Sequence, residues 1–142
     1  MTVRSILASK GHHIVSVEPE LKLSDAVKLL AERRIGAVLV IKDQRIEGIL
    51  SERDVVRVLG ERGGGALDEP VRNVRTRKVG GCGEKDTVAE IMERMTIGKF
   101  RHLPVMDGDS LVGLISIGDV VKWRVMEFER EQEALQEYIK TA

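Results

Sequence analysis

The heptad "GILSERD" at residues 48–54 returns as "GLISIGD" at residues 113–119, and this pair of segments decides the fold. The two heptads start 65 positions apart (113 minus 48), and the same offset aligns most of the chain without a gap. Two sets of apolar residues correspond under this offset: Leu23, Ala26, Val27 and Leu30 with Val88, Ile91, Met92 and Met95. Each set has the i, i+3, i+4, i+7 spacing of one helix face. The sequence therefore contains an internal repeat.

Each half has the same predicted order of elements: a short strand, a helix, two strands joined by a hairpin, and a second helix. The segments "HIVSV" and "KVGGC" supply the first strand, which Gly80 and Gly81 weaken in the second half. After the helix, "IGAVLVI" and "IEGIL" align with "FRHLPVM" and "LVGLI", with polar turn residues between them. Short β-branched runs separated by turn residues indicate hairpins. Helical periodicity then begins at Ser51 and at Ser116.

The first helix of each half starts differently. In the second half Thr87 and Glu90 have the spacing of a capping box. The first half has Lys22 and Asp25 at these positions and lacks the capping hydroxyl. We therefore expect a better-marked helix start in the second half.

These elements predict an α/β (α+β) fold of two β-α-β-β-α repeats. We expect the first repeat at residues 12–60, a linker at 61–76, the second repeat at 77–125 and a charged C-terminal helix at 126–142. Units of about 60 residues bury little surface alone, so we expect them to share one core around a pseudo-twofold axis, with a cleft between like halves. Three apolar residues can pin the glycine-rich linker to that core, namely Leu67, Val71 and Val74.

Both ends of the chain are predicted to lie outside the core. We expect Lys10, His12 and His13 to belong to a flexible terminus, although they could also reach a phosphate. The Glu-rich tail predicts a solvated helix, and a dimer contact is the alternative.

Composition excludes several function classes. The 142 residues include 23 basic and 23 acidic side chains, and only 3% are aromatic, which disfavours nucleic acid and a membrane surface as partners. The single cysteine cannot form an internal disulfide, and no Cys/His spacing is typical of zinc. There is no apolar run long enough for export or for a membrane span, so we expect a cytoplasmic protein.

The serine and aspartate of each heptad allow two interpretations. Ser51 with Asp54, and Ser116 with Asp119, have the S-x-x-D spacing of a helix cap, and this alone explains both pairs. Alternatively, a strand that ends at a helix N-terminus presents N–H groups and a hydroxyl to a phosphate, beside a carboxylate that accepts two ribose hydroxyls. A ribonucleotide would satisfy both groups at once.

The repeat resembles tandem CBS domains, the regulatory modules named after cystathionine β-synthase. The resemblance is carried by "IGAVLVI...GILSERDVV" and "FRHLPVM...GLISIGDVV" and spans about residues 12 to 125. Two copies in the expected order are specific, whereas one G-x-x-S-x-x-D would be weak. The resemblance implies adenosyl nucleotide binding in the cleft between the domains and dimerisation into a flat four-domain disc.

The resemblance also implies site residues. Asp54 and Asp119 would hold ribose hydroxyls, and Ser51 and Ser116 would help at ribose or phosphate. The opening of the second strand would supply backbone contacts to adenine and basic contacts to phosphate, through Ile35, Gly36, Ala37, Phe100, Arg101 and His102. The first strand would read the adenine edge through its backbone, at Val15, Ser16, Val17, Val79, Gly80 and Cys82. Whether a pocket uses strands of its own half or of the other one stays open.

The two halves are unequal. Arg53 stands beside Asp54 where the second half has Gly118, and Arg101 with His102 stand where the first half has Gly36 with Ala37. Arg53 offers a fork-shaped donor to the first site. Arg101 is either a phosphate ligand or a solvated surface arginine. We therefore expect sites of unequal affinity.

Three functions are compatible with these patterns. The first is a regulatory module that senses AMP, ATP or NAD(H), acts as a homodimer and controls an unidentified effector protein. The second is an enzyme, which we disfavour because no metal cluster, nucleophile-base pair or P-loop is recognisable, so we expect no catalytic residues and no catalytic cofactor. The third is a dimerisation scaffold whose nucleotide sites are vestigial.

Overall fold

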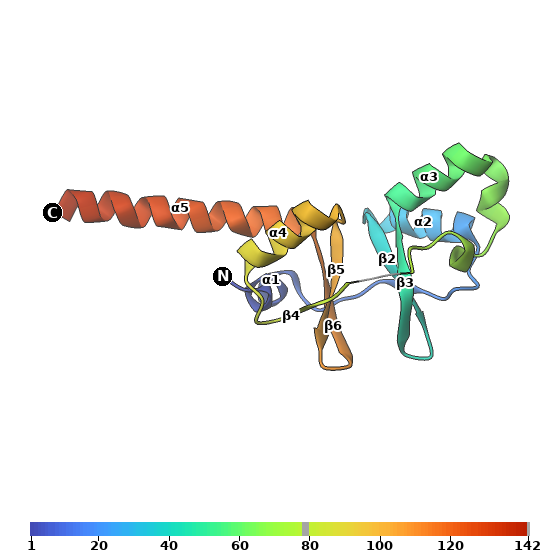
Figure 1. Cartoon of the computed structure of the whole chain (residues 1–142), viewed down its shortest axis with the longest axis horizontal. Helices are drawn as coiled ribbons and strands as arrows, with labels where there is room; N and C mark the ends of the chain where they lie inside the picture. Colours follow the sequence, from blue (N-terminus) through green and yellow to red (C-terminus); the bar gives the residue numbers. More distant parts are fainter. Residues whose placement is uncertain (78–79, 142) are drawn as a thin grey trace. The chain divides into compact units, whose positions relative to one another are not determined.

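The computed structural model describes residues 1–77 and 80–141, which belong to two compact units. The first unit comprises Ile14–Val79, and the second comprises Met1–His13 with Gly80–Ala142. Val79, which the resemblance assigned to the nucleotide site, lies outside the described residues. The described residues form five α-helices and two three-stranded sheets (Figure 1). This mixed architecture confirms the predicted fold class.

Each unit contains the predicted succession of strands and helices. The first unit has β1 (Ser16–Val17), α2 (Leu23–Arg33), β2 (Ala37–Lys42), β3 (Arg45–Ser51), α3 (Glu52–Arg62) and the short 3-10 helices η1 (Gly64–Asp68) and η2 (Val71–Asn73). The second unit has α1 (Val3–Lys10), β4 (Cys82–Gly83), α4 (Val88–Gly98), β5 (His102–Asp107), β6 (Ser110–Ser116) and α5 (Ile117–Thr141).

The two sheets have the same topology and register. In the first unit β1 pairs with β2 in parallel and β2 pairs with β3 in antiparallel, and β4, β5 and β6 repeat this pattern. Ala37 lies opposite Ser51, and His102 lies opposite Ser116. Each residue of the second pair thus lies 65 positions after its counterpart in the first pair. Each hairpin also shifts register at the equivalent place, after Val40 and after Val105. The internal repeat in the sequence is therefore a repeat of hydrogen-bonding pattern.

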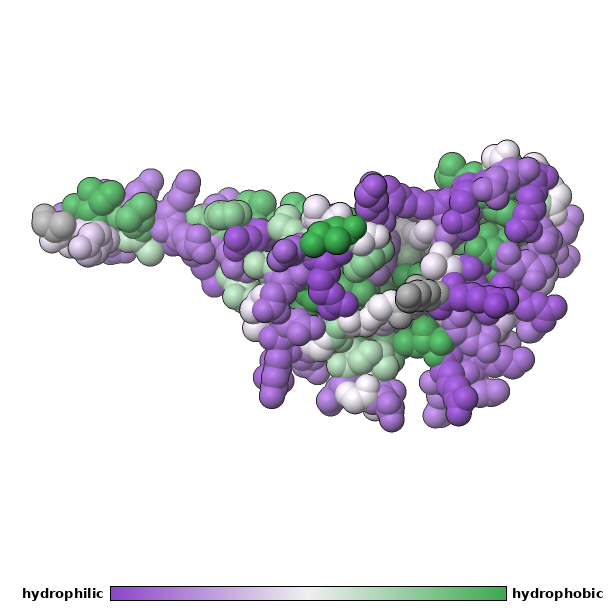
Figure 2. Space-filling model, in the orientation of Figure 1, coloured by the Kyte–Doolittle hydropathy of each residue, from purple (hydrophilic) through white to green (hydrophobic). Residues whose placement is uncertain are grey.

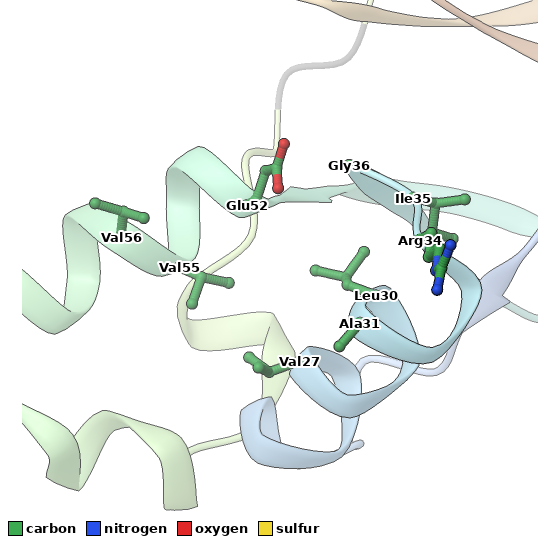
Figure 3. A pocket seen from close by; sticks show the side chains of 9 residues that line it. All are labelled: Val27, Leu30, Ala31, Arg34, Ile35, Gly36, Glu52, Val55 and Val56. Carbon is green, nitrogen blue, oxygen red and sulfur yellow. The ribbon is translucent and has the colours of Figure 1, made fainter.

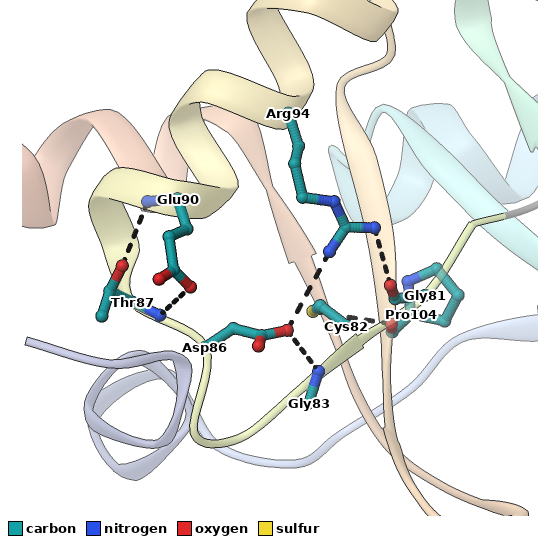
Figure 4. Close-up of polar contacts among 8 residues, drawn as sticks. All are labelled: Gly81, Cys82, Gly83, Asp86, Thr87, Glu90, Arg94 and Pro104. Carbon is teal, nitrogen blue, oxygen red and sulfur yellow. Dashed lines mark hydrogen bonds and ion pairs between the residues drawn. The ribbon is translucent and has the colours of Figure 1, made fainter.

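The starts of α2 and α4 follow the sequence prediction. Thr87 and Glu90 form a capping box at α4, in which each residue accepts a hydrogen bond from the backbone N–H of the other (Figure 4). The side chain of Lys22 makes no capping hydrogen bond at α2. The Leu23 N–H at that helix start donates to the Glu69 carbonyl at 2.9 Å, and the equivalent Val88 N–H of α4 donates to the Met1 carbonyl at 3.1 Å. Both helix starts therefore receive a backbone acceptor from a distant segment, and only α4 adds the side-chain cap.

Buried apolar side chains form two clusters, one in each unit, and the packing of the two halves around one core stays a prediction. The predicted helix faces supply both, since Leu23, Ala26 and Leu30 are buried in the first unit and Val88, Ile91 and Met95 in the second. Each cluster is completed by a segment outside the predicted β-α-β-β-α repeat. This addition enlarges the apolar cluster of each unit.

In the first unit the additional segment is the predicted linker. Val71 and Val74 are buried and Leu67 is partly buried against the same cluster, so the prediction that these residues pin the segment to a core is confirmed. Thr76 then forms an isolated antiparallel bridge with Ile49 of β3.

In the second unit the additional segment is α1. Val3, Ile6 and Leu7 are at most 1% exposed and belong to the cluster of the second unit. The prediction of a flexible N-terminus is therefore wrong. Burial of three large apolar side chains on one helical turn orders the segment, and each contributes about 1.5–3 kcal/mol of transfer free energy.

The two additional segments are themselves a repeat that the 65-residue offset conceals. The segment "VRSI" begins at Val3 and "VRNV" begins 68 positions later at Val71. The Val3 and Arg4 N–H groups donate to the carbonyls of residues 86 and 84, and the Val71 and Arg72 N–H groups donate to those of residues 21 and 19. These acceptors are again 65 residues apart. Each unit is therefore completed by an equivalent tetrapeptide.

Candidate functional site

The glycine of each heptad lies where the additional segment crosses the last strand of its sheet. A Cβ at Gly48 would clash with the Thr76 carbonyl oxygen and would lie 2.8 Å from Arg75 Cδ. A Cβ at Gly113 would lie 2.7 Å from a side-chain carbon of Leu7. Real Cβ atoms do not approach this closely, so only glycine fits without movement of the neighbours.

The serine and aspartate of each heptad cap the following helix. Ser51 Oγ accepts from the Asp54 N–H at 3.3 Å, and Asp54 Oδ2 accepts from the Ser51 N–H at 2.9 Å. Ser116 and Asp119 repeat these bonds at 3.2 and 2.9 Å. The cap interpretation is therefore confirmed for both heptads, and it orients both carboxylates in the same way.

Asp54 has further donors beyond its cap. The residue is 5% exposed, and its Oδ1 accepts from Thr76 Oγ1 at 3.1 Å and lies 3.3 Å from an Arg57 guanidinium nitrogen. Ser51 Oγ lies 3.1 Å from Oδ2. Because charge-assisted bonds are the stronger class, this network fixes the orientation of the carboxylate.

Asp119 is bound by a cation instead. Lys10 Nζ lies 2.7 Å from Asp119 Oδ2 and also donates to the Leu114 carbonyl at 2.9 Å. Burial raises the pKa of Asp119, but hydrogen bonds from Lys10 and Ser116 and the charge of Lys10 outweigh it, so the pKa lies below its ordinary value. The side chain of Asp119 is 24% exposed, so it is more accessible than Asp54.

Replacing Lys10 with methionine should lower the free energy of unfolding at pH 7 by up to about 1 kcal/mol, the usual range for a partly exposed ion pair. A carboxyl with a depressed pKa in the folded state gives stability above its unfolded pKa, and this stability is lost as the pH falls through the folded value. The difference in unfolding free energy between wild type and Lys10→Met should therefore shrink as the pH falls below 3.8, the ordinary pKa of an aspartate.

Urea unfolding at a series of pH values measures this difference. Lys28→Met is the matched control, because Lys28 is an exposed lysine of the first unit. A Lys10→Met penalty that is the same at neutral pH and at about pH 2.5 would show that the ammonium acts only through the Leu114 carbonyl.

The residues predicted at the opening of the second strand lie beside the heptads. Gly36 accepts from the Glu52 N–H at 2.9 Å, directly after Ser51, and Ala37 pairs with Ser51. In the second unit the backbone carbonyl of Arg101 accepts from the Ile117 N–H at 2.7 Å. The exposed side chains of Arg53 and Arg101 thus lie near the helix start of their own unit.

The predicted first-strand residues lie on the other side of the central strand. Ser16 and Val17 pair with Leu39 and Val40, and the Val15 carbonyl accepts from the Leu39 N–H at 3.3 Å. Because the strand order is β1-β2-β3, β2 separates them from the Ser51 end of β3. Their backbones lie at a sheet edge, as a contact to a base edge would require.

In the second unit Cys82 occupies the matching strand. Its thiol is buried and lies 3.7 Å from the Pro104 carbonyl oxygen (Figure 4). Burial, helped by the charge of Asp86 and opposed by that of Arg94, raises the pKa of the thiol to about 11. The side chain of Cys82 is therefore a poor nucleophile, and only its backbone and that of Gly80 can serve the predicted role.

A pocket of about 440 Å³ lies in the first unit between α2, α3 and the start of β2 (Figure 3). Most of its lining is apolar, with Arg34 and Glu52 as the charged members. Two predicted site residues, Ile35 and Gly36, line it, but Ser51 and Asp54 do not. The pocket is therefore adjacent to the first heptad rather than centred on its carboxylate.

The sequence prediction missed the partners of both carboxylates. Thr76 and Arg57 bind Asp54, and Lys10 binds Asp119 from a helix that was not predicted. The similarity of "VRSI" to "VRNV" was the available signal, because it places an equivalent segment ahead of Lys10 and ahead of Thr76.

Metal-binding clusters and membrane-spanning helices are both absent from the described residues. Among residues 1–77 and 80–141, no group of three or more His, Cys, Asp or Glu side chains could hold a metal ion. In the same part of the chain no helix combines the length and the apolar character needed to cross a membrane.

Comparisons with known proteins agree on one family. The family described as CBS domain matches residues 3–61 and 71–125. A solved CBS-domain containing protein from Agrobacterium tumefaciens is 39% identical, with a TM-score of 0.86 over 87% of this chain and 99% of that one. The mitochondrial CBS domain-containing protein CBSX3 of Arabidopsis thaliana is 33% identical over 82% of this chain and 59% of its own length. The chain thus spans about three fifths of that curated relative.

A more distant structure shares the fold and was solved with a ligand. The CBS domain protein of Pyrobaculum aerophilum complexed with AMP is 23% identical, with a TM-score of 0.72 over 84% of this chain and 89% of that one. At this identity the likeness concerns the fold.

Proposed function

The chain belongs to the CBS-domain family, and we propose that it is a non-catalytic regulatory module that binds an adenosyl ligand such as AMP, ATP or NAD(H). The observation that carries this proposal is the twofold occurrence of a capped helix start with a serine, a fixed aspartate and the opening of the central strand. The complex of a fold neighbour with AMP supports the same ligand class.

Ribose is the ligand group that suits the carboxylates. A carboxylate has about four acceptor positions. Asp119 receives Lys10 and the Ser116 N–H at Oδ2 and so retains positions for both ribose hydroxyls, whereas Asp54 has four present donors, two of which must leave. Helix N–H groups and the serine hydroxyl favour a phosphate nearby. The remaining proposed ligand contacts are those of the strand openings and first strands: Val15, Ser16, Val17, Ile35, Gly36, Ala37, Arg53, Val79, Gly80, Cys82, Phe100, Arg101 and His102.

The two carboxylates offer unequal sites. At Asp54 the ligand competes with the neutral hydroxyl of Thr76 and with the exposed side chain of Arg57, whereas at Asp119 it meets the ammonium of Lys10. Both carboxylates receive charge-assisted hydrogen bonds, but within the described residues only Asp119 has a lysine ammonium bound to it. Turned away from Asp119, Lys10 would contact a ligand phosphate. We therefore propose that the second site favours ligands with more phosphate charge.

Several properties are proposed together with this function. The module acts as a homodimer that controls an effector protein, and it resides in the cytoplasm, where Cys82 stays a free thiol. A non-catalytic role is supported by the raised thiol pKa and by carboxylates that are engaged as helix caps.

Calorimetry of the full chain with AMP, ATP, NAD(H) and S-adenosylmethionine tests the proposal. We expect at least one ligand to bind with a Kd below about 1 mM, which corresponds to about −4 kcal/mol. Asp119→Asn should weaken this binding if the ligand uses the second heptad. Failure of all four ligands to bind below that limit would overturn the proposal and leave a dimerisation scaffold, which the exposed apolar residues of α5 favour.

A further inference from the structure

The helix α5 exposes a regular apolar stripe. Six large apolar side chains of α5 are between 40% and 71% exposed: Val121, Val125, Phe128, Leu135, Tyr138 and Ile139. All except Tyr138 follow one another at spacings of four, three, seven and four residues. Figure 2 shows hydrophobic surface at intervals along this helix and near its free end.

This spacing is a heptad pattern. Val125 and Ile139 occupy a positions, and Val121, Phe128 and Leu135 occupy d positions, with Gln132 at the central a position. The stripe is distinct from the face that packs inside the second unit, where Val120 is fully buried and Trp123 contacts the core. From residue 128 to residue 141 every side chain is exposed, so this half of α5 has no core to face.

Charges flanking the stripe favour a second copy of the same helix. In a parallel pair, a g position faces the e position five residues later on the partner helix. Arg124 at g would face Glu129 at e, and Glu131 at g would face Gln136 at e. The first pair is attractive, and neither pair brings together like charges. Arg124 now lies 3.1 Å from Glu127 and over the ring of Phe128, at the edge of the stripe.

Gln132 favours the parallel orientation. In a parallel coiled coil an a residue meets the same residue of the partner, so two Gln132 amides can hydrogen-bond to each other. In an antiparallel pair an a residue packs against d residues, here Leu135 or Phe128, and a buried amide would lack a partner. A single polar residue at an a position commonly fixes register in this way.

We propose that α5 pairs with α5 of a second copy of this chain as a parallel two-stranded coiled coil over residues 121–139. The proposal rests on the homodimer of the proposed function and specifies its interface, but it does not depend on nucleotide binding. Because α5 starts at the Ser116–Asp119 cap, a ligand at Asp119 would contact the same helix that joins the two copies. The helix has 25 residues, so its capped start and its C-terminal end lie about 37 Å apart.

Single cysteine variants test the orientation. Val125→Cys and Ile139→Cys each place a thiol at an a position, and in a parallel pair each should form a disulfide-linked dimer under mild oxidation. Ala134→Cys, at an exposed position outside the stripe, is the matched control and should remain monomeric on a non-reducing gel. Wild type should not cross-link, because its Cys82 is buried.

Other cross-linking results would overturn the proposal. In an antiparallel pair an a residue faces a d residue, so neither variant would cross-link with itself, whereas Val125→Cys mixed with Leu135→Cys, or Ile139→Cys mixed with Phe128→Cys, would cross-link. That result would exclude the parallel orientation. No cross-linking above that of Ala134→Cys, alone or mixed, would exclude the coiled coil.

A charge variant tests the contribution of the stripe. Leu135→Lys should weaken the dimer at least tenfold in sedimentation equilibrium, whereas Ala134→Lys adds the same charge outside the stripe and should leave it unchanged. Equal dimerisation of both variants would overturn the proposal, as would a monomeric wild type. Calorimetry with AMP on the same proteins keeps the two failures apart, because lost nucleotide binding in an intact dimer would contradict only the proposed function.

Discussion

Replacing Gly48 with alanine is expected to lower the free energy of unfolding by about 3 kcal/mol, at the upper end of the range for overpacked sites. The added Cβ would meet the Thr76 carbonyl, which is backbone and cannot rotate away. That carbonyl accepts from the Ile49 N–H at 3.0 Å, so moving it would break the bridge that holds the segment on β3. Denaturation by urea with a fluorescence or circular dichroism signal measures the change.

Two other glycines calibrate this prediction. Gly113→Ala should cost less, because its neighbour is the flexible end of the Leu7 side chain. Gly60→Ala should stabilise the protein by about 0.5–1 kcal/mol, since Gly60 lies inside α3 with nothing within 4 Å of its added Cβ. A loss at Gly48 no greater than that at Gly113 would contradict a backbone clash.

Much of the fold could be predicted because its signals are local. The hairpins, the helix faces and the S-x-x-D caps each depend on residues a few positions apart, and the 65-residue offset presented every signal twice. The register that sets Ala37 against Ser51 follows from the hairpin itself. Local sequence signals are therefore sufficient to predict that the strand openings lie beside the heptads.

The additional segments could not be predicted in the same way. Lys10 and Asp119 are separated by 109 residues, and no spacing rule connects them. The short helix α1 has only three buried residues, and its order depends on the second unit rather than on its own propensity. The glycine of the heptad was recognised as a repeat element, but its cause lies in a crossing segment that only tertiary structure brings close.

The same limit applies to the partners of the heptad aspartates. Sequence spacing predicted a helix cap and a ribose site as compatible interpretations, and the structure confirms the cap. The structure also identifies the side chains that a ribose would meet at the carboxylates, namely Thr76, Arg57 and Lys10. Unequal sites were expected because Arg53 has Gly118 as its counterpart. In the structure the two carboxylates also differ in their donors.

Replacing Asp54 with alanine should reduce both stability and ligand affinity. The change leaves the Ser51 N–H and the Thr76 hydroxyl without their acceptor at a site that is 5% exposed, which should cost about 1–3 kcal/mol of stability. Loss of the ribose acceptor should weaken the best-binding nucleotide by a similar free energy, a factor of roughly 5 to 150. Thermal unfolding and calorimetry on the same protein separate the two effects.

Matched variants decide whether Asp54 is more than a cap. Asp25 occupies the same position in the first turn of α2 but is exposed and opposite an N-cap lysine, so Asp25→Ala should change stability by less than about 0.5 kcal/mol and leave binding intact. Thr76→Val removes the competing donor from Oδ1, so it should preserve or strengthen nucleotide binding while it lowers stability. If Asp54→Ala unfolds at a lower temperature yet binds every nucleotide as wild type does, the first heptad is a helix cap alone. A ribose site predicts instead that Asp54→Ala and Thr76→Val, which both disrupt the same hydrogen bond, change affinity in opposite directions.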